Sequence, residues 1–168
     1  MELRPETEAD WWEVEALLDL CFAPGREALS SYRLREGIPP VQGLSTVARD
    51  EGNILAGAIR FWPVRIGDQI GGQTGTGTAL LLGPIAVHPT HQGEGLGAYL
   101  MRSSLATARE RGWERVMLVG DAPYYGRFGF ERLDLVEMPP PTNPDRVLGL
   151  DLVPGAWRGV AGKVTRAA

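Results

Sequence analysis

Residues 80–101 read LLLGPIAVHPTHQGEGLGAYLM, and this stretch decides the fold of the chain. It opens with an apolar run of the kind found in strands that are buried on both faces of a sheet. A glycine-rich loop follows, and apolar residues then recur at helical spacing, which predicts a helix over residues 96–111. The predicted buried face of this helix comprises Ala98, Met101, Leu105 and Ala108, and Gly112 suits its C-terminal cap.

This order of strand, loop and helix is typical of a site that binds an anion. The first turn of a helix carries N–H groups that have no partner within the helix, and the helix dipole favours negative charge there. Gly93, Gly95 and Gly97 lack a Cβ, so a phosphate group can approach the main chain closely. The same glycines also fit a tight turn between a strand and a helix, so the loop alone does not identify a ligand.

The predicted strand carries Gly83 and Pro84 in its interior. Proline has no N–H to donate to a neighbouring strand, and it is therefore confined to edges and bulges of sheets. We expect the strand to be bulged or splayed at this point.

Helices and strands also alternate outside this stretch. Thr7 and Asp10 resemble a capping box, and an apolar stripe behind them predicts a first helix with Trp11, Val14, Leu17, Leu18 and Cys21 on its buried face. Short helices are expected at residues 27–35 and 124–128. Strands are expected at residues 46–49, 54–62, 115–119 and 146–152, and near Phe130. This order predicts an α/β fold of mixed strand pairing, with residues 1–168 forming a single domain.

Composition excludes several classes of function. The formal net charge of −4 and the pI of about 5.2 argue against a nucleic-acid partner, since phosphate binding over a large surface needs a basic face. Cys21 is the only cysteine, so neither an intramolecular disulfide nor a four-thiolate zinc site can form, and we expect no metal. No apolar run approaches the ~20 residues of a membrane span, so we expect a cytoplasmic protein without a membrane partner.

The spacing within the loop narrows the choice of ligand. No lysine follows the glycines, so the P-loop pattern is absent, and Leu100 occupies the third glycine position of a dinucleotide-binding fingerprint. Residues 92–97, QGEGLG, instead read Q-x-x-G-x-G, which resembles the acetyl-CoA pyrophosphate loop of the GNAT superfamily. Residues 124–130, YYGRFGF, are similar to the Tyr-x-x-x-Gly-Phe signature of that family, with Tyr125 at the tyrosine position. The resemblance covers roughly residues 3–135.

The resemblance implies an acyl-CoA N-acyltransferase fold, with a mixed central sheet of six to seven strands and about four helices. It also implies an N-acetyltransferase that moves an acetyl group from acetyl-CoA to a primary amine by direct attack. Tyr125 would protonate the departing thiolate, and main-chain groups of Ile85, Ala86 and Val87 would contact the pantetheine arm. The pyrophosphate would rest on the loop and the first helical turn, at Gln92, Gly93, Glu94, Gly95, Leu96, Gly97 and Ala98.

One position departs from the family pattern. Many members carry an asparagine where this chain has Asp121, and the asparagine contacts the pantetheine arm. An ionised aspartate cannot donate the same hydrogen bond, so Asp121 either holds the arm differently or acts on the acceptor. Asp121, His88 and Glu27 are the candidates for a base that deprotonates the amine, and His91 is interpreted as a solvated loop residue.

The sequence is also compatible with other functions. A non-catalytic acyl-CoA-binding or sensor module could keep the same fold, and a nucleotide-binding regulatory domain could use the same glycine-rich loop. The acceptor could be a small-molecule amine, a protein N-terminus or a lysine side chain, and the donor could carry a longer acyl group. A homodimer is also compatible with the sequence.

Overall fold

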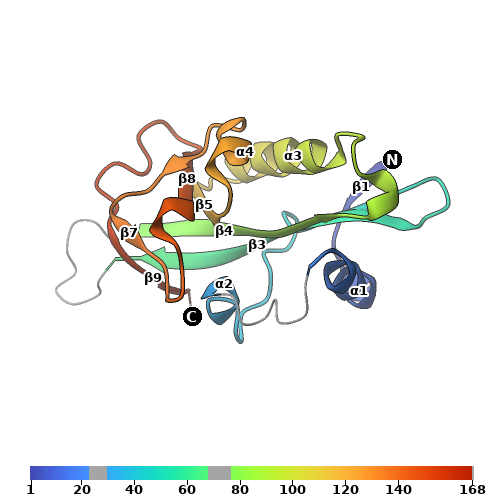
Figure 1. Ribbon diagram of the computed structural model, residues 1–168, viewed down its shortest axis with the longest axis horizontal. Coiled ribbons are helices and arrows are strands. Elements are labelled where there is room, and N and C mark those ends of the chain that lie inside the picture. Colours follow the sequence, from blue (N-terminus) through green and yellow to red (C-terminus); the bar gives the residue numbers. More distant parts are fainter. Residues whose placement is uncertain (23–29, 68–76, 168) are drawn as a thin grey trace.

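The computed structural model describes residues 1–22, 30–67 and 77–167. Its centre is one mixed sheet with the main strand order β1-β2-β3-β4-β5-β8-β6, which agrees with the predicted six to seven strands (Figure 1). These strands span Glu2–Pro5 (β1), Thr46–Arg49 (β2), Leu55–Ile66 (β3), Gly77–Val87 (β4), Arg115–Val119 (β5), Val147–Asp151 (β8) and Glu131–Arg132 (β6). Two short strands, Val136–Glu137 (β7) and Gly162–Arg166 (β9), pair with each other, and β9 also pairs with β3.

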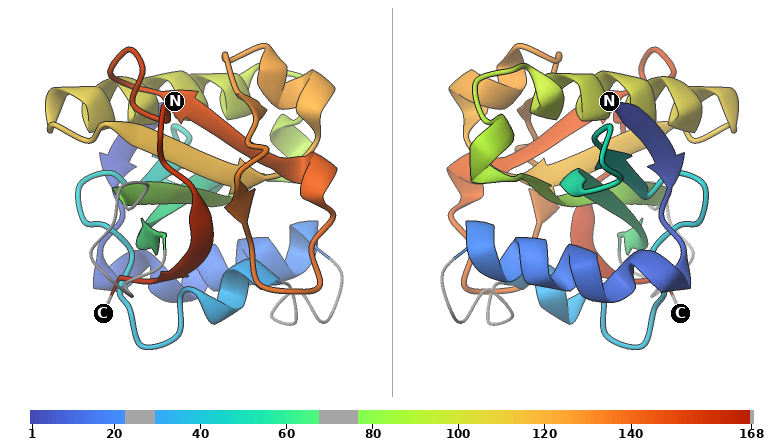
Figure 2. Two further views of the ribbon diagram at one scale, coloured as in Figure 1. Left: turned by 90° about the vertical axis from the view of Figure 1, so that its left-hand side faces the viewer. Right: turned by 90° about the vertical axis from the view of Figure 1, so that its right-hand side faces the viewer.

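Helices cover both faces of the sheet. The described residues contain four α-helices: Trp11–Cys21 (α1), Ser30–Arg33 (α2), Leu96–Glu110 (α3) and Ala122–Gly126 (α4). Figures 1 and 2 show α3 and α4 on one face and α1 and α2 on the other. No helix in the described part of the chain is long and apolar enough to span a bilayer.

The helix α3 begins at Leu96, as predicted, and ends next to the expected cap at Gly112, whose φ is +89°. Its buried face packs on the core residues of β3 and β4, and it comprises Leu96, Leu100, Met101, Ser104, Leu105 and Ala108. The predicted member Ala98 is only half-buried. The prediction was shifted because it assigned Ala98 to the core and omitted Leu100.

The helix α1 buries Val14, Leu17 and Leu18, but the predicted stripe is wrong at its first residue. Trp11 is 36% exposed, because its ring covers the guanidinium of Arg60 at 4.0 Å instead of entering the core. The expected pairing of Thr7 with Asp10 is present: the Asp10 carboxylate accepts the Thr7 N–H at 2.9 Å, within a 3₁₀ turn at Glu8–Asp10 that precedes the helix.

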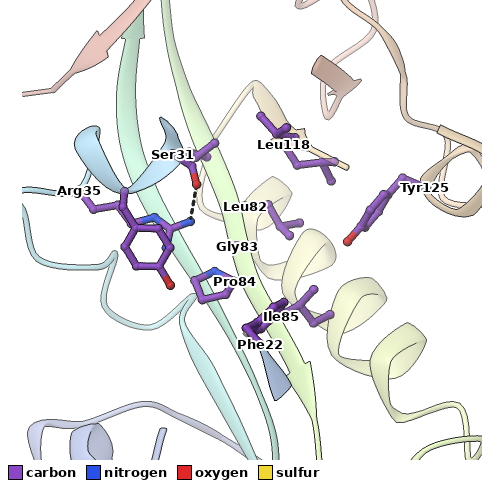
Figure 3. A pocket seen from close by; sticks show the side chains of 12 residues that line it. Phe22, Ser31, Arg35, Leu82, Gly83, Pro84, Ile85, Leu118 and Tyr125 are labelled. Atoms are coloured by element: carbon purple, nitrogen blue, oxygen red, sulfur yellow. Dashed lines mark hydrogen bonds between the residues drawn. The ribbon is translucent and has the colours of Figure 1, made fainter. Parts of the chain in front are cut away.

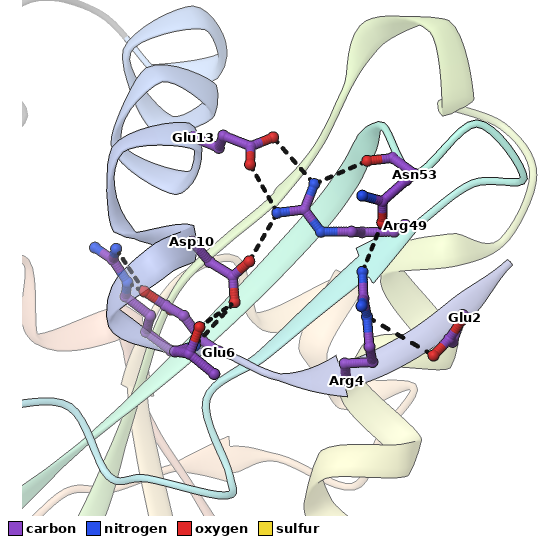
Figure 4. Close-up of polar contacts among 9 residues, drawn as sticks. Glu2, Arg4, Glu6, Asp10, Glu13, Arg49 and Asn53 are labelled. Atoms are coloured by element: carbon purple, nitrogen blue, oxygen red, sulfur yellow. Dashed lines mark hydrogen bonds and ion pairs between the residues drawn. The ribbon is translucent and has the colours of Figure 1, made fainter.

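Two buried arginines attach α1 to the sheet. Arg49 of β2 is 5% exposed and donates to Asp10 at 2.7 Å and to Glu13 at 2.9 Å (Figure 4). Arg60 of β3 is 3% exposed and donates to Glu6 at 3.0 Å and to Glu15 at 2.7 Å. Because a buried charge is costly without a partner, removing one partner of either cluster should destabilise the fold far more than its surface ion pairs do.

The predicted irregularity of the strand at residues 83 and 84 is confirmed. The register between β3 and β4 shifts there: Ile59 faces Ile85, and Phe61 faces Leu82, so Arg60 lies opposite both Gly83 and Pro84. This two-against-one arrangement is a β-bulge. The indole N–H of Trp62 donates to the carbonyl of Gly83 at 2.6 Å and satisfies one group that the bulge removes from the ladder.

Three short strands, β1, β7 and β9, were not predicted. The residues of β1 are mostly exposed and polar, and β9 lies beyond the segment 146–152, the last for which the sequence predicts a strand. That segment contains β8, which lies between β5 and β6 inside the sheet. Polar sequence concealed both β1 and β9, because edge strands bury too little surface to show an apolar pattern.

Candidate active site

The sheet opens between the parallel strands β4 and β5. They pair only at Leu80 with Val116 and at Leu81 with Met117, although both strands continue beyond this point. The edge of β4 from Leu82 onward therefore has no partner on β5 among the described residues. A cavity of about 180 Å³ lies at this divergence, lined by the bulge, by Leu118 and Val119 of β5, and by Tyr125 (Figure 3).

Tyr125 closes one side of this cavity. It lies on α4, and its hydroxyl points across the cavity toward β4 (Figure 3). The ring is fixed by edge contacts with Tyr124, at a centroid distance of 4.9 Å, and with Phe130, at 6.1 Å. It also lies directly against Gly120, where any Cβ would collide with it. Burial raises the pKa of Tyr125, so the hydroxyl stays protonated at neutral pH.

The spacing between Tyr125 and the Gly-Phe pair has a structural reason. The N–H of Phe130 donates to the carbonyl of Tyr125 at 3.3 Å, and Gly129 turns the chain between them with a φ of +96°. Phe130 is thereby returned to the core beside the Tyr125 ring. The neighbouring Tyr124 points elsewhere: its hydroxyl lies 3.7 Å from the position that a Cβ on Gly97 would take.

The loop before α3 has the open main chain that the sequence predicts. Gly93 and Gly95 have φ values of +84° and +81°, and no described atom lies within 4 Å of the position of a Cβ at either residue. Gly95 is the N-cap of α3 and offers no side chain to the first helical turn. The amides of that turn are thus available to an anion, which is the property on which the pyrophosphate prediction depends.

Two other predicted residues of this loop, Gln92 and Glu94, contact neighbouring groups of the same segment. The Gln92 amide donates to the carbonyl of Val87 at 3.4 Å, and the Glu94 carboxylate lies 3.0 Å from Nδ1 of His91. His91 also lies 3.7 Å from the carboxylate of Asp50. His91 thus lies in the loop, as interpreted, but it is half-buried, and its ring lies between this loop and the turn that joins β2 to β3, a contact that the sequence did not predict.

The candidates for the base are not brought together. The Nδ1 atom of His88 accepts the Thr90 N–H at 3.2 Å, so this nitrogen caps its own turn. Asp121 is exposed, caps α4 by accepting the Tyr124 N–H at 3.4 Å, and is not among the residues that line the cavity. Glu27 lies outside the described residues. No group of three or more metal-ligating side chains gathers anywhere in the described ranges.

The far side of the cavity comes from residues that sequence reasoning missed. Phe22 follows α1, Ser31 and Tyr32 lie on α2, and Arg35 follows α2 (Figure 3). The Arg35 guanidinium lies 4.1 Å from the ring centroid of Tyr32 and 5.2 Å from that of Trp62. A helix was predicted at residues 27–35, but nothing in its sequence indicates that it faces the split in the sheet.

Comparison with known proteins identifies the family. The model of the acetyltransferase (GNAT) domain matches residues 2–133. The protein named uncharacterized N-acetyltransferase YhbS of Escherichia coli (strain K12) is 32% identical over 131 residues, which are 78% of this chain and 74% of that protein. The chain belongs to the GNAT acetyltransferase family.

Solved structures agree with this assignment to the GNAT family. A crystal structure of YhbS from Escherichia coli in complex with CoA has a TM-score of 0.79 and 28% identity, and the match covers 98% of this chain and 88% of the YhbS chain. A GNAT family acetyltransferase from Brucella melitensis in complex with acetyl-CoA has a TM-score of 0.71 and 28% identity, and the match covers 99% of this chain and 96% of the Brucella chain. The GNAT fold and the class of acyltransferase are thus established for this chain.

Proposed function

We propose that this GNAT enzyme transfers the acetyl group of acetyl-CoA to a primary amine by direct attack on the thioester. The observation that carries the proposal is the cavity at the divergence of β4 and β5, which brings the unpaired edge of β4 and the hydroxyl of Tyr125 together. Two relatives of similar fold were solved with CoA and acetyl-CoA, which supports this choice of donor.

The donor would lie across the opened edge of the sheet. Main-chain groups of Ile85, Ala86 and Val87 would contact the pantetheine arm, because β5 has already diverged from β4 at these residues. The pyrophosphate would rest on the amides of residues 93–98, at the positive end of the α3 dipole. Asp121 would act indirectly in this arrangement, since it caps the short helix that carries Tyr125.

In the chemical step the amine nitrogen forms a bond to the thioester carbon, and the C–S bond breaks. An N–H of the exposed β4 edge would stabilise the negative charge that develops on the carbonyl oxygen. Tyr125 would give its proton to the sulfur as the C–S bond breaks. The pKa of a phenol lies above the value of about 8.5 for a thiol, so the hydroxyl is still protonated when the sulfur leaves. The amine must first lose a proton, which costs roughly 4–5 kcal/mol for a lysine-like group at pH 7.

The acceptor would enter from the side of α2. Phe22, Tyr32 and Pro84 give that side of the cavity an apolar character, with the cationic group of Arg35 at its wall. A small-molecule amine, a protein N-terminus and a lysine side chain remain the acceptor classes to be separated.

The direct test is release of free thiol from acetyl-CoA over a panel of amines of these three classes. Acceptor-dependent release by the natural protein, and its loss in Tyr125→Phe, is the expected result. The alternative, a non-catalytic CoA-binding or sensor module, predicts that acetyl-CoA raises the melting temperature while no amine of the panel releases thiol. That combination would refute the proposed transferase activity.

A further inference from the structure

Two arginines, one on α3 and one just after α4, contact the same aromatic ring and have no acidic partner among the described residues. Arg102 lies on the exposed side of α3, and Arg127 follows α4. Their guanidinium carbons stand 5.1 Å and 5.7 Å from the centroid of the same ring, Phe128. Among the described residues, no aspartate or glutamate forms an ion pair with either arginine. The two guanidinium groups thus share one aromatic ring, and the printed contacts of both are aromatic.

Several other arginines have acidic partners, and others donate to main-chain carbonyls. Arg49 and Arg60 are surrounded by carboxylates, and Arg115 and Arg132 each have an acidic partner at 3.2 Å or less. The chain has more acidic than basic residues, so carboxylates are not scarce. A pair of unneutralised guanidinium groups on an acidic protein is the arrangement expected for a bound anion that is not part of the chain.

The position of the pair relates it to the loop before α3. The Arg127 guanidinium also lies 4.8 Å from the ring centroid of Tyr124, and the hydroxyl of Tyr124 approaches Gly97 in the first turn of α3. Both views in Figure 2 show α4, in orange, beside the yellow-green start of α3. An anion held by the two arginines would therefore lie next to the one expected at the α3 amides.

We infer that Arg102 and Arg127 bind the 3′-phosphate of CoA. This inference rests on the proposed function, which puts the pyrophosphate on the first turn of α3. In CoA the pyrophosphate is attached to the 5′ oxygen and the third phosphate to the 3′ oxygen of one ribose, so the two anionic groups are separated by a single sugar. Planar guanidinium groups match a phosphate monoester in geometry and charge, and Phe128 and Tyr124 keep both guanidinium groups in place before the ligand arrives.

The decisive experiment compares CoA with 3′-dephospho-CoA, which differs from it by this one phosphate. Dissociation constants of both ligands are measured by calorimetry on the natural protein, on Arg102→Gln, on Arg127→Gln and on the double variant. Arg158→Gln, which removes one positive charge from an exposed loop between β8 and β9, is the matched control.

The natural protein and the control should bind CoA at least about tenfold more tightly than dephospho-CoA, a factor that corresponds to ~1.4 kcal/mol. Each single variant should reduce this preference, and the double variant should bind both ligands equally. Affinity for dephospho-CoA should stay within about twofold throughout. The preference should also fall as salt is added, because exposed charges are screened.

Two outcomes would overturn different claims. If the double variant keeps the full preference for CoA, the arginines do not hold the 3′-phosphate, and the proposed donor site is unaffected. If the natural protein binds neither CoA nor dephospho-CoA, the proposed function itself fails. Both arginines are exposed, so the variants should fold, and their melting temperatures verify this.

Discussion

A methyl group added at Gly95 tests whether an anion rests on the start of α3. Gly95 has a φ of +81° and lies at the N-terminus of the helix, and Gly112 has a φ of +89° and lies just past the C-terminus. At both positions the space that a Cβ would enter contains no described atom within 4 Å. The variants Gly95→Ala and Gly112→Ala therefore introduce the same kind of strain at opposite ends of one helix.

The expected magnitudes follow from this symmetry. Holding an alanine in the left-handed region costs about 1–2 kcal/mol, so both variants should lose that amount of free energy of unfolding. Only the methyl group at residue 95 would occupy the space assigned to the pyrophosphate. Gly95→Ala should therefore weaken CoA binding at least about tenfold, or ~1.4 kcal/mol, while Gly112→Ala should leave the dissociation constant nearly unchanged.

Urea unfolding and calorimetric titration with CoA measure the two quantities on the same preparations. Unchanged CoA affinity in Gly95→Ala, together with a loss of stability equal to that of Gly112→Ala, would show that the pyrophosphate lies elsewhere. Equal loss of affinity in both variants would also refute the reasoning, because the effect would then arise from general destabilisation of α3 instead of contact with the ligand.

Three further results are expected. Tyr125→Phe should lower kcat about 10²–10⁴-fold with little change in KM for acetyl-CoA, whereas Tyr124→Phe should do much less; near-full kcat in Tyr125→Phe would exclude Tyr125 as the acid. Asp121→Asn should keep the cap of α4 and the dissociation constant for CoA, whereas Asp121→Ala should lower the free energy of unfolding in urea by about 1 kcal/mol. A large drop in kcat for Asp121→Asn at unchanged stability would instead assign Asp121 to the acceptor side. Hydrogen bonds from Arg49 lower the pKa of Glu13, so they stabilise the fold above the ordinary pKa of about 4.3, and this stabilisation is lost as the pH falls through the lowered pKa. The melting temperature of Glu13→Gln should therefore fall less steeply with acid than that of the natural protein, and an equally steep fall in both would contradict this.

The central part of the fold was predictable because its signals are local. The apolar run, the proline inside it and the glycines before α3 each constrain neighbouring residues, and the bulge opposite Arg60 and the helix start at Leu96 follow from them. The same holds for Tyr125, since the hydrogen bond from Phe130 to its carbonyl joins residues five positions apart. Short-range chemistry of this kind is visible in one sequence.

Features that depend on contacts between distant segments could not be predicted from the sequence. The polar strands β1 and β9 exist because β2 and β3 offer them unpaired edges. Phe22, Tyr32 and Arg35 line the cavity because the chain after α1 and around α2 lies beside the bulge of β4. Arg102 and Arg127 are unremarkable in the sequence, and only the packing of α4 beside α3 brings both to the ring of Phe128. The sequence determined the strand, the loop and the helix of this GNAT fold, and the tyrosine that we propose as the acid. The tertiary structure decided which side chains from other segments face them, because sheet order and helix packing are set by burial of the whole core instead of by any neighbouring residues.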